Sequence, residues 1–231
     1  MAFRVRFPIP ENMSWVRLKD YCSELGLNRD IIIWELEEDS HVLGNVNMVD
    51  PPVIEIKPTD DISRLEGRIA HEITHVSLEL HGYRNLAEHS EPIKNEVKYI
   101  SFLNQFANLL HHQVLYPRLS AIGFSLADDM DLVQSYYAAP ANVQQMRQAY
   151  YSGERFAKAW VVVSIMNDLI RLPDNRHRLV NLITPDLMDA LNDSQEILQE
   201  IGVVNTLEKY GQSKVIIEQR LGIPSFDYYI E

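Results

Sequence analysis

The chain has 231 residues, 46% hydrophobic and 23% charged, which is the composition of an ordinary globular protein. Its formal charge of −12 would repel phosphate backbones and anionic lipid, so we expect neither nucleic acid nor a membrane surface as a partner. A single cysteine, Cys22, excludes an intrachain disulfide framework, and the sequence has no signal-peptide pattern or membrane-spanning apolar run, so we expect a cytoplasmic protein.

The first 60 residues predict a short helix followed by three strands. Residues 14–27 have the apolar spacing of an amphipathic helix, and Gly26 lies where such a helix ends. β-Branched and aromatic residues gather at 31–38, and two further strands are expected, one within 41–50 and one at 53–57. Because these strands are short and consecutive, we expect a small β-meander.

The rest of the chain predicts helices. One begins at a capping residue within 60–63 and ends at Gly82. A second begins at Ser90 and runs to about Tyr116, before Pro117. Further helices are expected at residues 126–138, 144–172 with a break near Ser152-Gly153, 185–201 and 213–221. The expected fold class is α+β, with a first domain over residues 1–125 and a mainly helical region over residues 126–231.

The sequence HEITH, residues 71–75, predicts a metal site. On a helix, His71 and His75 stack on one face about 6 Å apart, so both imidazoles can reach one ion. They lie on a different face from Ile69 and Ile73, among which core histidines would be expected. Glu72 adjoins the pair and could act as a general base on water, which is the HExxH arrangement of zinc hydrolases. The alternative is two surface or hydrogen-bonded structural histidines.

The third ligand decides the class of the site. His81 follows His71 at the spacing that metzincins use, but Leu78 stands where those proteins have a helix-breaking glycine. A continuous helix would place His81 about 9 Å along the axis from His75, too far to share an ion. Glu96 is predicted on the apolar face of the second long helix, where a carboxylate is costly unless paired or bound to metal. We therefore expect Glu96 as the third ligand. The alternatives are Glu88, Glu91 and His81.

Three segments of the chain resemble a known group of enzymes. VIEIKP (53–58), RIAHEITH (68–75) and KNEVKYISFLNQFANLL (94–110) resemble gluzincin metallopeptidases, in which an Asn-Glu pair, here Asn95-Glu96, follows the HExxH helix. The order of elements within residues 1–125 is most similar to the ImmA/IrrE-type metallopeptidase domain. HHQVLYPRL (111–119) departs from the usual ending of that domain. The resemblance implies a zincin-like domain, Zn²⁺ held by His71, His75 and Glu96, and hydrolysis of a peptide or protein substrate.

We therefore expect a zinc peptidase in which Glu72 takes a proton from the attacking water and passes it to the leaving amine. The alternatives are a metal-binding regulatory protein on a zincin scaffold with little turnover, and a helical protein with a structural metal. For His111-His112 we favour a hydrogen-bonded pair at a helix end, and residues 126–231 could be a lid or a docking module for a partner. Candidates for stabilising the oxyanion are Tyr83, His81, His89, Tyr99 and His112.

Overall fold

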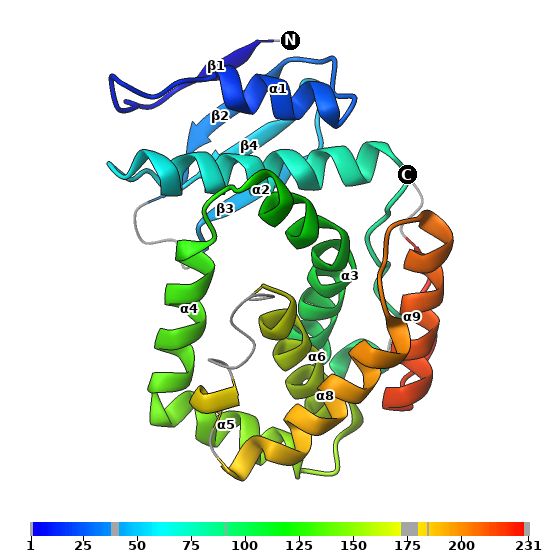
Figure 1. Cartoon of the computed structure of the whole chain (residues 1–231). Helices are drawn as coiled ribbons and strands as arrows, with labels where there is room; N and C mark the ends of the chain where they lie inside the picture. Colours follow the sequence, from blue (N-terminus) through cyan, green and yellow to red (C-terminus); the bar gives the residue numbers. More distant parts are fainter. Residues whose placement is uncertain (1, 38–41, 91, 172–179, 184, 229–231) are drawn as a thin grey trace. The chain divides into compact units, whose positions relative to one another are not determined.

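The computed structural model describes residues 2–37, 42–90, 92–171, 180–183 and 185–228 (Figure 1). Contacts divide the chain into two compact units. The first consists of Met1–Gly82 and Arg118–Asp128, and the second of Tyr83–Pro117 and Asp129–Glu231. Residues 83–117, which we placed in the amino-terminal domain, therefore share their contacts with the helical unit.

The first unit contains a four-stranded mixed sheet with the order β1-β2-β4-β3. Strands β1 (Phe3–Val5), β2 (Ile31–Glu35) and β4 (Val53–Ile56) are parallel, and β3 (Gly44–Asn47) is antiparallel to β4. The expected α+β class is confirmed, but the expected meander is wrong, because β4 pairs with both β2 and β3.

The composition of the strands explains this order. Ile54 and Ile56 of β4 are fully buried, and Val53 is nearly so, which suits a strand with neighbours on both sides. By contrast, β3 has the sequence GNVN, with exposed asparagines at positions 45 and 47. A polar strand is tolerated best at the edge of a sheet, which is where β3 lies.

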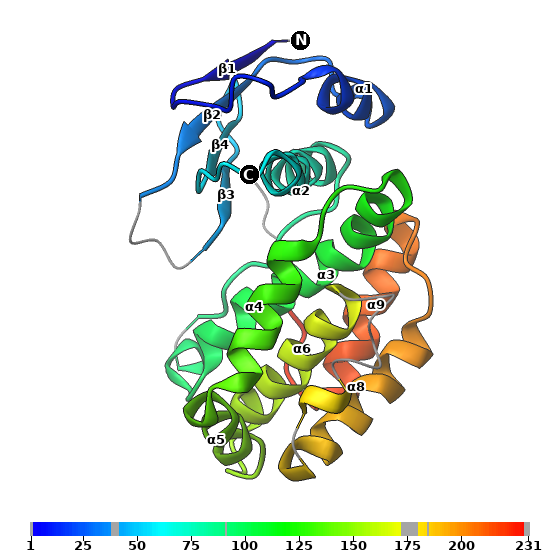
Figure 2. The same cartoon turned by 60° about the vertical axis from the view of Figure 1, so that its left-hand side comes forward.

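Helices α1 (Val16–Glu24) and α2 (Ile62–Leu80) lie on one face of this sheet (Figure 2). The parallel pairing of β1 with β2 requires a crossover connection, and the chain between these strands contains α1. A hydrogen bond of 2.7 Å between the Tyr21 and Thr74 hydroxyls joins the two helices inside the core. The helix α2 was predicted almost to the residue, and Gly82 follows it with a φ of 87°.

The segment Arg118–Asp128 completes the first unit by binding to α2. The carboxylate of Asp128 accepts hydrogen bonds of 2.7 Å from Arg64 and 2.6 Å from Arg68. A Cβ atom at Gly67 would meet the carbonyl of Ser125, so only glycine lets the two backbones approach this closely. We call these contacts the Asp128 clamp.

The second unit is helical. Its central helix, α6 (Arg155–Arg171), is buried on nearly all sides and packs against α5 (Pro140–Tyr150) and α8 (Met188–Ile201). The break expected near Ser152-Gly153 separates α5 from α6. Other helices with described bounds are η1 (Ile93–Asn95), α3 (Tyr99–Ile122), α4 (Ala127–Ala138), η3 (Pro185–Leu187) and α9 (Leu207–Leu221). Among the described helices, none is both long and apolar enough to cross a membrane.

Helix α3 differs from its prediction at both ends. It begins at Tyr99 rather than Ser90, directly after Lys98, which has a φ of 63° that a helix does not accommodate. It also continues through Pro117, where it was expected to end. Buried side chains on both sides of Pro117, such as Tyr116 and Leu119, explain the continuation, because their packing offsets the roughly 3 kcal/mol that an internal proline costs.

Candidate metal centre

Helix α2 carries His71, Glu72 and His75. Asp61 caps the helix by accepting a 3.1 Å hydrogen bond from the Arg64 backbone nitrogen. One side of α2 is anchored in the core by residues that are fully buried, Leu65, Ile69, Ile73 and Val76. His71 and His75 lie outside this apolar stripe and are half-buried, as the spacing predicted. Their imidazoles are therefore held by a rigid helix while remaining accessible.

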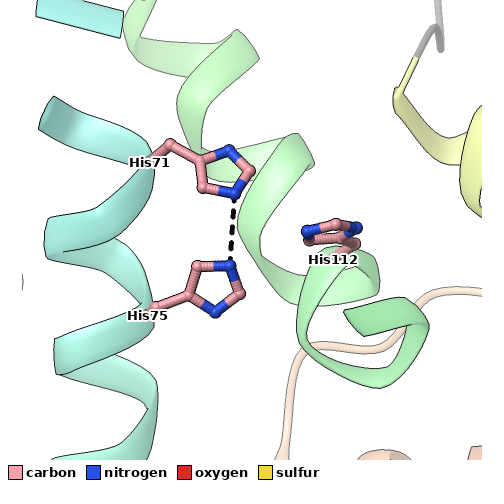
Figure 3. A group of neighbouring side chains, drawn as sticks. All are labelled: His71, His75 and His112. Atoms are coloured by element: carbon pink, nitrogen blue, oxygen red, sulfur yellow. Dashed lines mark hydrogen bonds between the residues drawn. The ribbon is translucent and has the colours of Figure 1, made fainter. Parts of the chain in front are cut away.

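The two imidazoles of α2 point toward each other (Figure 3). Their Nε2 atoms are 3.2 Å apart. Two nitrogens bound at 2.0–2.1 Å to one tetrahedral ion would be roughly 3.3–3.4 Å apart. The observed separation is close to this expected nitrogen–nitrogen distance, so His71 and His75 need little movement to bind the same ion.

The structure adds His112 of α3 to this pair. One ligand atom from each of His71, His75 and His112 can be chosen so that all lie within 4.8 Å of one another. Figure 3 draws these three side chains. His112 is buried, and its Nδ1 is 3.0 Å from Oδ1 of Asn167. We call these three residues the histidine cluster.

Glu96, the expected third ligand, is not part of this group. It follows the short helix η1 with an extended backbone, φ −67° and ψ 150°, so it does not lie on the apolar face of a long helix. Its two carboxylate oxygens accept hydrogen bonds from Arg155, one of them at 2.9 Å. These bonds lower the pKa of the Glu96 carboxyl. This ion pair with α6 gives the Glu96 carboxylate a partner without a metal.

The other candidate ligands lie outside the histidine cluster. The Nδ1 atom of His81 is 2.7 Å from the Ser77 carbonyl oxygen, one turn earlier on α2, so this ring caps the end of the helix. Glu88 is likewise not in the group, and Glu91 lies outside the described residues.

Several candidates for oxyanion stabilisation are used in the packing of the second unit. The Tyr99 hydroxyl accepts a 2.6 Å hydrogen bond from the His89 backbone nitrogen, and both rings lie near Phe226. The Tyr83 ring packs edge-on against Tyr210 at 5.2 Å. These contacts give Tyr99, His89 and Tyr83 structural partners.

The general-base candidate, Glu72, is buried beside the edge strand β3. A Cβ atom at Gly44 would lie 2.8 Å from both Cγ and Cδ of Glu72. Only a residue without a side chain leaves room for the carboxylate in this position. Gly44 therefore leaves the space that the Glu72 carboxylate occupies.

The cluster presents three imidazoles, a donor set that suits a first-row transition metal such as zinc. Three protein ligands leave a coordination position open, which is the usual arrangement in catalytic rather than structural zinc sites. The chemistry of the donors and the 3.2 Å nitrogen separation both fit such an ion.

From the sequence, His112 was predicted only as a candidate for oxyanion stabilisation or as half of a hydrogen-bonded pair, and Asn167 was not predicted. The available signal for Asn167 was its place directly after the apolar run 159–166, where a polar residue needs a specific partner.

Comparison with protein-family models, curated proteins and solved structures finds no match to this chain.

Proposed function

We propose that this protein is a zinc-dependent hydrolase of peptide bonds, with the metal held by His71, His75 and His112 and with Glu72 as general base. The observation that carries the proposal is the histidine cluster on α2 and α3, with Glu72 directly after its first member. A structural metal site has no use for a base beside a ligand, whereas a hydrolytic site needs one.

The chemistry assigned to the chain follows from these positions. The bound ion would polarise the substrate carbonyl and lower the pKa of a water molecule toward about 7. Glu72 would accept the proton of that water as it attacks the carbonyl carbon. The same carboxylate would then deliver the proton to the leaving nitrogen, so that the amine departs neutral. The short approach between Gly44 and Glu72 keeps the base in a fixed place.

The peptide substrate is inferred from the resemblance of the RIAHEITH segment to zinc metallopeptidases. That resemblance implies roles for His71, Glu72 and His75. With His112 as third ligand, the site differs from the gluzincin pattern, in which a glutamate completes the set. We therefore propose a zinc peptidase with three histidine ligands.

The test combines metal analysis with turnover. Purified protein should contain about one equivalent of zinc after reconstitution and should cleave members of a generic peptide library. Chelation should abolish cleavage, and added zinc should restore it. Zinc binding without any cleavage, in the wild type and in Glu72→Gln alike, would instead indicate a metal-binding regulatory protein.

A further inference from the structure

A buried chain of hydrogen bonds links His112 to Asn167 and Gln105 inside the second unit. The Nδ1 atom of His112 is 3.0 Å from Oδ1 of Asn167. The amide nitrogen of Asn167 donates to the Gln105 backbone oxygen at 2.8 Å and to the Gln105 side-chain oxygen at 3.0 Å. His112 and Gln105 belong to α3, and Asn167 belongs to α6.

Only one arrangement of protons on the neutral side chains is consistent with this series of hydrogen bonds. The backbone oxygen of Gln105 can only accept, so the Asn167 atom facing it must be the NH₂ group. The carbonyl oxygen of Asn167 then faces His112 and also only accepts. The proton between them must come from Nδ1 of His112. In its neutral form this imidazole therefore carries its proton on Nδ1 and its lone pair on Nε2.

We propose that Asn167 is a positioning residue that holds His112 in the Nδ1–H tautomer, so that Nε2 is the metal ligand, and that Gln105 orients Asn167. This inference rests on the proposed function and deepens it. A metal-binding histidine commonly donates its other ring N–H to an oxygen acceptor, which fixes the ring and makes the binding nitrogen more basic. Asn167 supplies that acceptor from a different helix.

The neighbouring His111 carries its proton on the other ring nitrogen from His112. The Nε2 atom of His111 is 2.9 Å from the Tyr83 backbone oxygen, which can only accept, so His111 carries its proton on Nε2. Its position in the sequence is nearly the same, yet its Nε2 is occupied by a structural hydrogen bond. His111 therefore uses Nε2 for a structural hydrogen bond, whereas the acceptor beside His112 bonds its Nδ1.

The surroundings of Asn167 support a specific role. It is 1% exposed in a helix whose buried residues are otherwise almost entirely apolar, including Ile165, Met166 and Leu169. A leucine would fill a similar volume without the cost of burying an amide. The amide is retained here with both its donor and its acceptor sides bonded, which is what orientation of a neighbouring ring requires.

The test measures the tautomer and the zinc affinity separately. Nitrogen NMR of metal-free protein with ¹⁵N-labelled histidine, just above neutral pH, should show His112 protonated on Nδ1, with the signal assigned by its loss in His112→Gln. In Asn167→Leu, His112 should shift toward the Nε2–H form, and zinc affinity in competition with a chromophoric chelator should fall about 10–100-fold. The matched control is Ser194→Ala, which removes a buried 3.0 Å hydrogen bond to Val162 of α6 and should change neither quantity.

The inference is overturned if wild-type His112 carries its proton on Nε2, or if folded Asn167→Leu binds zinc as tightly as the wild type. If Asn167→Leu does not fold, the tautomer of His112 measured in the wild-type protein tests the inference. If the wild type takes up no zinc while His112 carries its proton on Nδ1, the proposed function is wrong. The NMR result would then still support the assignment of the tautomer by the hydrogen bond to Asn167.

Discussion

Arg155 donates hydrogen bonds to both carboxylate oxygens of Glu96, across 59 residues of sequence. For two single variants, this ion pair and the histidine cluster together predict the opposite of what the sequence predicted. Glu96→Ala should leave zinc content near that of the wild type, because the carboxylate has its partner on α6. His112→Ala should lower zinc content steeply, because it removes one of the three proposed ligands.

Both variants should be dialysed under identical conditions and measured by elemental analysis, with a thermal melt to confirm folding. His81→Ala serves as a control that should keep its zinc, since that ring bonds the end of α2. An empty site in Glu96→Ala beside a loaded one in His112→Ala would return the third position to Glu96.

The role of Glu72 can be separated from metal binding. Glu72→Gln should retain zinc, because this residue is outside the histidine cluster, and should lower peptide hydrolysis roughly 10²-fold or more. Glu79→Gln, the same change further along α2, should leave hydrolysis near the wild-type rate. If Glu72→Gln loses its zinc, the carboxylate is itself a ligand and the assigned roles are wrong.

Gly44→Ala tests whether the edge strand positions the general base. The new methyl group would lie 2.8 Å from Cγ and Cδ of Glu72 and must displace the side chain. A displacement of about 1 Å can cost on the order of 10²-fold in rate, so hydrolysis should fall while zinc content is unchanged. Asn45→Ala alters an exposed side chain on the same strand and is the control. A fully active Gly44→Ala would mean that Glu72 works equally well from another position.

The Asp128 clamp predicts a dependence of stability on acid. Burial opposes ionisation of Asp128, but the hydrogen bonds from Arg68 and Arg64 outweigh it and hold the pKa of the carboxyl below its ordinary value. The native state thus binds this proton less tightly than the unfolded chain does. The ionised carboxylate contributes stability above the unfolded pKa of about 3.9, and that contribution is lost as the pH falls through the native pKa.

Asp128→Asn should therefore unfold more easily at neutral pH, by about 1–3 kcal/mol, and should lose less further stability on acidification than the wild type. Urea unfolding at neutral and acidic pH measures both effects. Equal acid dependence in the two proteins would show that other carboxylates are responsible.

The parts of the site that were predictable from the sequence are those within one helix. The cap at Asp61, the apolar stripe and the spacing of His71 and His75 are all local features of α2. The third ligand that we propose differs from the predicted one because α3 begins only after Lys98 and because Glu96 has a distant partner, Arg155. Neither follows from spacing. The place of β3 at the edge could have been inferred from the polar sequence GNVN, but the consecutive order of the strands suggested a meander.

The Asp128 clamp also has a consequence for the order in which the protein is made. The sheet, α1 and α2 are all synthesised by residue 82, but the carboxylate that binds Arg64 and Arg68 follows only after α3. The first unit is therefore incomplete on the ribosome until all of α3 and the start of α4 have emerged, although chains usually complete their amino-terminal units first. We expect nascent chains long enough for Asp128 to have left the ribosomal exit tunnel to resist protease within α2, and shorter chains in which α2 but not Asp128 has left the tunnel to be cut there.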